Sequence, residues 1–116
     1  MNCLFILNDA PYANERAYNA LRLATALTSD PDRTVRIFFT GEGAWCAVAN
    51  HTVPQGQHDI EWMLKRFLAG LREVAVCATC MDARSISAAM LIEGIRASSM
   101  DELAVWTVEA DRVLVF

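Results

Sequence analysis

Two cysteines three residues apart are the part of this sequence best suited to covalent chemistry. Cys77 and Cys80 form a Cys-x-x-Cys motif between the apolar run Val74-Ala75-Val76 and a segment of helical character. The thiolate is the nucleophilic form of cysteine, and a helix N-terminus or a nearby cation lowers a thiol pKa by stabilising that anion. Arg84, seven residues after Cys77, is the candidate cation. The motif predicts a reactive thiol at Cys77, with Cys80 as a candidate resolving partner.

Two other interpretations of these cysteines stay open. Both could be small buried hydrophobic residues, since free cysteine is among the most buried residue types. The spacing also suits zinc, which usually takes four ligands, but nothing in the sequence brings His51, His58 or Cys46 to the pair. We therefore expect no metal and no cofactor, and both histidines should be exposed loop or helix-start residues. Cys3 and Cys46 are expected to be packing residues.

Composition and charge limit the classes of function. The chain has 116 residues, 54% of them hydrophobic, which is enough for the core of one domain spanning residues 1–116. Ten Lys+Arg against fourteen Asp+Glu give a net charge of −4, and the basic residues form no cluster, so nucleic-acid binding is not expected. The longest apolar run, residues 44–49, is far shorter than the about 20 residues of a membrane span. With no basic segment typical of a signal peptide, we expect a cytoplasmic protein with reduced thiols.

Hydrophobic periodicity predicts the elements that would position the cysteines. Strands are expected at residues 3–7, 35–39, 73–77, 95–97 and 113–116. Helices are expected at residues 14–28, 58–71, 86–93 and 100–110, with a short helix and a loop within 44–56. Alternating strands and helices, with strands apolar throughout, predict a three-layer α/β/α domain with a mainly parallel sheet of about five strands. Ligands of such sheets bind beyond the carboxyl ends of the strands, where residues 8–12, 40–43 and 77–84 would lie.

Several blocks of this sequence resemble the DsrE/DsrF-like family of small sulfur-relay proteins, which includes YchN-like and TusD-like members. The resemblance covers nearly the whole chain. The blocks are a first helix with the Pro-Tyr before it, a second strand and its turn, the cysteine segment, and the closing helix and strand, at residues 11–24, 35–43, 76–86, 100–104 and 110–116.

The resemblance implies a three-layer α/β/α fold assembled as a homo-oligomer, commonly a trimer or hexamer. In sulfur-relay members, a cysteine after the third strand carries a persulfide and passes sulfur between donor and acceptor proteins. By position, that cysteine matches Cys77, and Arg84 matches the family's arginine. The sequence departs from the family at Ser85, where glycine is usual, and a serine there is expected to reshape the pocket. The resemblance thus implies a sulfur carrier or sulfurtransferase that uses Cys77, Cys80 and Arg84.

Two alternatives belong to other classes of function. A non-catalytic oligomeric binding module would account for the high apolar content and would leave the cysteines as packing residues. A thiol–disulfide oxidoreductase would use Cys77 and Cys80 as a reversible disulfide pair. Exposure of the Cys77 thiol distinguishes the first alternative from sulfur transfer, and the fate of the sulfur atom distinguishes the second.

Overall fold

Short strands rich in β-branched and aromatic residues form one parallel sheet. The computed structural model describes residues 1–116. The strands are β1 (Asn2–Leu7), β2 (Thr34–Phe39), β3 (Val74–Cys77), β4 (Ile95–Ser98) and β5 (Arg112–Val115), and they lie in the order β4-β3-β2-β1-β5. All four pairings are parallel. The carboxyl ends of all five strands therefore meet at one edge of the sheet.

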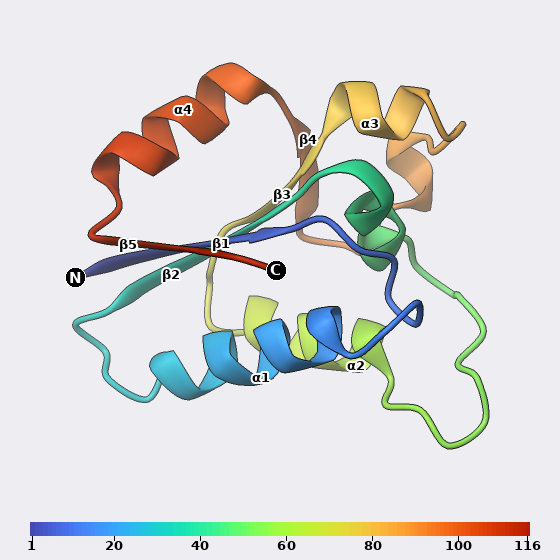
Figure 1. Ribbon diagram of the computed structural model, residues 1–116, viewed down its shortest axis with the longest axis horizontal. Helices are drawn as coiled ribbons and strands as arrows, with labels where there is room; N and C mark the ends of the chain where they lie inside the picture. The colour runs from blue at the N-terminus through green and yellow to red at the C-terminus, as the bar shows by residue number, and fades with distance from the viewer.

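Helices cover both faces of this sheet. The amphipathic helices α1 (Arg16–Leu27) and α2 (Ile60–Leu68) pack on one face, and α4 (Met100–Glu109) and the short α3 (Ala78–Asp82) lie on the other (Figure 1). This arrangement confirms the predicted three-layer α/β/α fold, and it makes the sheet entirely parallel. The longest helix has 12 residues, and no helix combines the length and apolarity that a membrane crossing needs.

Alternating side chains of the strands divide the core between the two faces. On the α1–α2 face, Phe5, Ile37 and Val76 belong to a cluster of 22 buried residues. On the α4 face, a smaller cluster contains Leu4, Phe38, Ala75, Cys77 and Trp106. Because neighbouring residues of one strand point to opposite faces, a strand that is buried on both faces is apolar throughout. The Cys77 side chain thus points toward the α4 layer.

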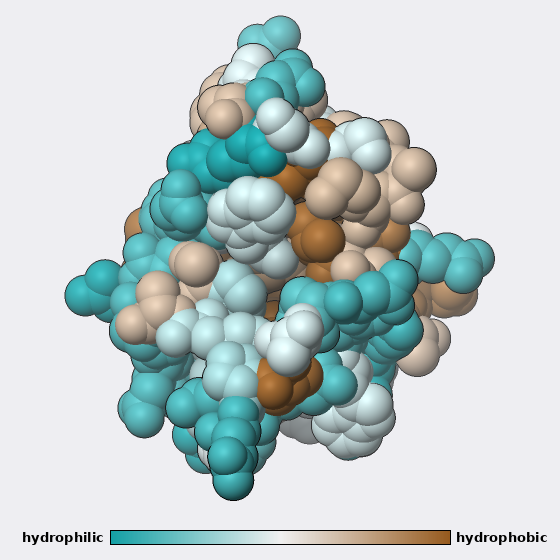
Figure 2. All heavy atoms as spheres, turned by 90° about the vertical axis from the view of Figure 1, so that its right-hand side faces the viewer, coloured by the Kyte–Doolittle hydropathy of each residue, from teal (hydrophilic) through white to brown (hydrophobic).

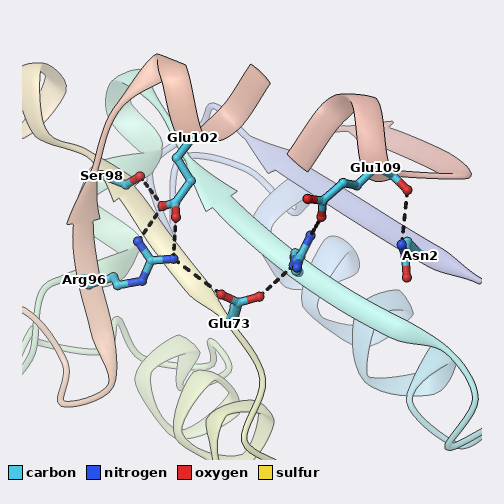
Figure 3. A network of polar contacts seen from close by, with 7 residues as sticks. Asn2, Glu73, Arg96, Ser98, Glu102 and Glu109 are labelled. Atoms are coloured by element: carbon cyan, nitrogen blue, oxygen red, sulfur yellow. Dashed lines mark hydrogen bonds and ion pairs between the residues drawn. The ribbon is translucent and has the colours of Figure 1, made fainter. Parts of the chain in front are cut away.

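A polar network attaches α4 to the sheet (Figure 3). Arg36 pairs with Glu73 at 2.8 Å and with Glu109 at 2.7 Å, and Arg96 pairs with Glu73 at 3.5 Å and with Glu102. Both guanidinium groups also lie over the Trp106 ring, at 5.1 and 5.6 Å from its centroid. Trp106, the one buried residue of α4, is therefore held by its apolar cluster and by two cations.

The segment after α3 differs from the expectation. The predicted helix over 86–93 is wrong: only a single 3₁₀ turn, η2 (Ala88–Met90), forms there. The backbone groups of this segment bond instead to residues 47–49, much earlier in the chain. The N–H of Ala49 donates to Met90 O, and the N–H of Ile92 donates to Ala47 O, both at 2.8 Å. Residues 47–49 lie at the end of η1 (Gly41–Ala47), the 3₁₀ helix found where a short helix and a loop were expected. Hydrogen bonds between residues 47–49 and residues 90–92 therefore take the place of the helical hydrogen bonds expected within residues 86–93.

Candidate functional site

The two cysteines of the motif lie where β3 becomes α3. Cys77 is the last residue of β3 and the N-cap of α3, and Cys80 follows in the first turn of α3. Each thiol shifts the pKa of the other, so the two side chains lie close together. Cys77 is only 1% exposed, whereas Cys80 is partly exposed and packs against both apolar clusters. The structure therefore brings the predicted pair together as an inner thiol and an outer thiol.

The surroundings of the two thiols shift their pKa values in opposite directions. Burial opposes ionisation of Cys77, but bonds from Cys80, from the Thr79 side chain at 3.1 Å, and from the backbone N–H groups of Cys80 and Thr79 lower the pKa of this thiol. The pKa of Cys80 is raised, first by burial and then by its bond to Cys77, although N–H of Gly41, at 3.2 Å, favours its anion. The arrangement favours a thiolate at Cys77 and a thiol at Cys80.

Arg84 belongs to the surroundings of Cys80 rather than of Cys77. Its Nη1 donates to the carbonyl of Cys80 at 3.0 Å, and its Nε and Nη2 each lie 3.0 Å from Oε1 of Glu42. Its charge favours the anion of Cys80. Arg84 therefore ties α3 to η1 and acts on the outer thiol, while backbone N–H groups stabilise the inner one.

Ser85 occupies a backbone conformation that normally favours glycine. Its φ is +56°, in the left-handed region. The N–H of Ile86 donates to Met81 O at 3.0 Å and the N–H of Ser85 donates to Asp82 O at 3.2 Å, which is the bond pattern of a Schellman cap with its left-handed residue at Ser85. The chain thus makes the turn after Arg84 without the glycine that is usual in the family.

The sequence did not assign Gly41 and Glu42 to the cysteine site. Residues 41–43 are a Gly-Glu-Gly segment that follows β2. In the structure Gly41, with φ of +54°, donates its N–H to Cys80. Gly43 packs so closely on the end of β1 that a Cβ would lie 2.2 Å from Leu7 O. The signal that could have linked these residues to the cysteines is their position after a strand. Because β2 and β3 are neighbouring parallel strands, the segments that follow them lie at the same edge of the sheet.

The remaining cysteines and histidines lie elsewhere. Cys46 is fully buried, donates its S–H to Asp9 O at 3.4 Å, and burial raises its pKa to about 12. Cys3 is buried in the larger cluster. His51 contacts the Tyr12 hydroxyl at 3.2 Å, and His58 stacks on a tyrosine of α1. No three or more His, Cys, Asp or Glu side chains are grouped to hold a metal ion.

The edge that carries the cysteine site is a mixed surface. Figure 2 views the molecule from the right-hand side of Figure 1, toward which the strands run. Hydrophobic residues gather mainly in the upper right of this face, and hydrophilic residues lie mainly to the left of them and below them.

Comparison with known proteins assigns the family. The model of the DsrE/DsrF-like family matches residues 1–116. The chain belongs to this family. The protein YchN of Escherichia coli K12 is 35% identical over 114 residues, which are 97% of each chain. An uncharacterised protein of Methanopyrus kandleri is 33% identical over 112 residues, 96% of this chain and 90% of its own.

Solved structures agree with this family assignment. The crystal structure of YchN from E. coli superposes with a TM-score of 0.90 at 35% identity and covers both chains completely. A protein of unknown function from Methanobacterium thermoautotrophicum has a TM-score of 0.80 at 10% identity, covering 99% of this chain and 98% of its own. The second likeness shows that the DsrE-like fold of this chain is shared well beyond recognisable sequence similarity.

Proposed function

We propose that this DsrE-like protein is a cytoplasmic sulfur carrier that holds a persulfide on Cys77. The observation that supports the proposal most is the place of Cys77 at the N-cap of α3, where the Thr79 hydroxyl lies 3.1 Å from its sulfur and nearby N–H groups lower the pKa of the thiol. A persulfide is also anionic near neutral pH, so the same donors suit the loaded form. Burial of Cys77 at 1% exposure is what the binding-module alternative expects, so the carrier proposal depends on the stabilised anion at Cys77 and on the partly exposed thiol of Cys80 beside it.

The proposed transfer exchanges one sulfur atom and no net electrons. A protein thiolate attacks the outer sulfur of a donor persulfide R–S–SH, the donor S–S bond breaks, and R–S⁻ leaves. The chain then carries –S–SH on Cys77. On unloading, the outer sulfur passes to an acceptor thiolate, and Cys77 is left as a thiolate that the surrounding N–H groups stabilise. The donor and the acceptor are partner proteins or small persulfides and thiols.

Intact-mass measurement tests this function. The purified protein is incubated with a sulfane donor, desalted and weighed, and then incubated with an acceptor thiol and weighed again. We expect a gain of one sulfur atom that is lost to the acceptor. The Cys77→Ser/Cys80→Ser variant should gain nothing, and the matched Cys3→Ala/Cys46→Ala control should load like the wild type. A wild-type protein that gains no sulfur from any donor would refute the proposal.

Thiol–disulfide exchange is the second candidate function. The closeness of the Cys77 and Cys80 side chains favours it, because attack of one sulfur on a mixed disulfide or persulfide of the other would close a disulfide. In that case a sulfane donor would yield free sulfide and a protein lighter by two hydrogens. Persistence of the added sulfur therefore separates a carrier from an oxidoreductase.

We propose further that the chain assembles through α4 and β5. Val105 and Val108 on α4 are 54% and 86% exposed, and Val113 and Val115 on β5 are 43% and 64% exposed. The strand β5 pairs only with β1, so the backbone groups of its outer edge are free to bond to another chain. This apolar surface fits a homo-oligomer, and it would serve equally if the protein were a non-catalytic binding module. Sedimentation of Val108→Lys beside the wild type tests the assembly, and an unchanged oligomer would refute it.

A further inference from the structure

Resting on the proposed carrier function, we propose that sulfur reaches Cys77 through Cys80, which acts as the thiol that exchanges with partners. The argument starts from access. A persulfide on another molecule must bring its outer sulfur into contact with the attacking sulfur atom. Cys77 is 1% exposed and lies in a cluster with Phe38 and Trp106, so a donor has almost no direct access to its sulfur. Cys80 is partly exposed.

The position of Cys80 is also suited to passing sulfur between a partner and Cys77. Its side chain packs against the α4-face cluster that contains Cys77 and against the larger cluster on the opposite face. Its sulfur accepts the N–H of Gly41 at 3.2 Å, and Arg84 bonds to its carbonyl at 3.0 Å. Both groups come from the edge of the sheet where a partner can approach. The outer sulfur of a persulfide on Cys80 would thus start next to the sulfur of Cys77.

The two steps balance in sulfur, protons and electrons. In the first step, Cys80 attacks the outer sulfur of R–S–SH, its proton passes to the neighbouring thiolate of Cys77, and R–S⁻ leaves. In the second step, Cys77 attacks the outer sulfur of the Cys80 persulfide and gives its proton back to the departing Cys80 sulfur. The products are a persulfide on Cys77 and a thiol on Cys80. Sulfur leaves the protein by the reverse order.

The proximity of the two sulfurs explains why an internal step would be efficient. A reaction between groups held in contact avoids the entropy cost of bringing two molecules together. The second step needs only a side-chain movement, whereas direct attack by Cys77 on a donor needs the buried cluster that contains Phe38 and Trp106 to open. The network of Arg36, Arg96, Glu73, Glu102 and Glu109 holds α4, which contributes Trp106 to this cluster (Figure 3).

The order of loading tests the proposal. Wild-type protein is mixed with glutathione persulfide, quenched at intervals with an alkylating reagent and digested with trypsin. The peptide 73–84 contains both cysteines, and tandem mass spectrometry locates the added sulfur. We expect sulfur on Cys80 first and on Cys77 later. In Cys77→Ser the sulfur should stay on Cys80, and in Cys80→Ser and Cys80→Ala the loading of Cys77 should be slower by at least roughly tenfold.

Each contrary outcome has a separate meaning. If Cys80→Ser and Cys80→Ala load Cys77 at the wild-type rate, or if Cys77→Ser never carries sulfur on Cys80, the two-step route is overturned while the carrier function stands. If the wild type gains no sulfur at all, the carrier function itself fails. Cys3→Ala serves as the control for a buried cysteine outside the site and should load at the wild-type rate.

Discussion

Replacement of Ser85 by glycine should stabilise the protein. Ser85 has φ of +56°, is exposed, and its side chain makes no hydrogen bond. An L-residue in the left-handed conformation costs roughly 1–2 kcal/mol, which Ser85→Gly would remove. Glycine has more conformational freedom in the unfolded chain, which offsets about 0.5–1 kcal/mol of that gain. We therefore expect the free energy of unfolding to rise by about 0.5–1 kcal/mol, equivalent to roughly 2–4 °C in Tm.

Urea denaturation of Ser85→Gly beside the wild type measures this change. The matched control is Ser29→Gly, because Ser29 is also an exposed serine at the end of a helix but does not have a positive φ. The control should lose up to about 1 kcal/mol, so the two variants should shift in opposite directions. A loss of stability in Ser85→Gly similar to that of Ser29→Gly would refute the assignment of a left-handed cap to Ser85.

Three further substitutions test other parts of the structure. Gly43→Ala should lower the free energy of unfolding by about 2 kcal/mol or more, because its Cβ would lie 2.2 Å from Leu7 O, and a loss below about 0.5 kcal/mol in urea denaturation would contradict that contact. Tyr12→Phe removes the hydroxyl that accepts the N–H of Ile60 at 3.2 Å and should cost about 1 kcal/mol in the same assay, whereas wild-type stability would argue against the bond. The pKa of Glu102 is lowered by its bonds to an arginine and a serine, so its contribution is complete above the pKa of the unfolded state and is lost as pH falls through the lower folded value. Glu102→Gln should therefore be less stable than the wild type by about 0.5 kcal/mol at neutral pH and equally stable near pH 3, and a difference that persists in acid would contradict the linkage.

The strands and the fold class could be predicted from the sequence, and the strand order could not. Apolar runs such as Val74–Cys77 are continuous because both faces of the sheet are covered, and that pattern is visible in one sequence. The place of β5 beside β1 depends on where α4 crosses the sheet, which Trp106 and its two arginines determine through contacts between distant residues. Periodicity within a segment contains no information about such contacts.

The cysteine site was predictable in its position and not in its exposure. Spacing alone placed Cys77 and Cys80 at one turn, and the structure brings them together. The burial of Cys77 follows from the α4 layer, and the assignment of Arg84 to Cys80 follows from its pairing with Glu42, a residue 42 positions away. Both facts arise from tertiary packing. Short elements such as α3 were also missed, because five residues are too few to show helical periodicity.

The location of the added sulfur after loading tests the central claim most directly. Wild-type protein is loaded to saturation with a sulfane donor, alkylated and digested, and the 73–84 peptide is sequenced by tandem mass spectrometry. The account predicts one additional sulfur atom, on Cys77, in this peptide and none on the peptides that contain Cys3 or Cys46. Additional sulfur on Cys3 or Cys46 with an unmodified 73–84 peptide would contradict it.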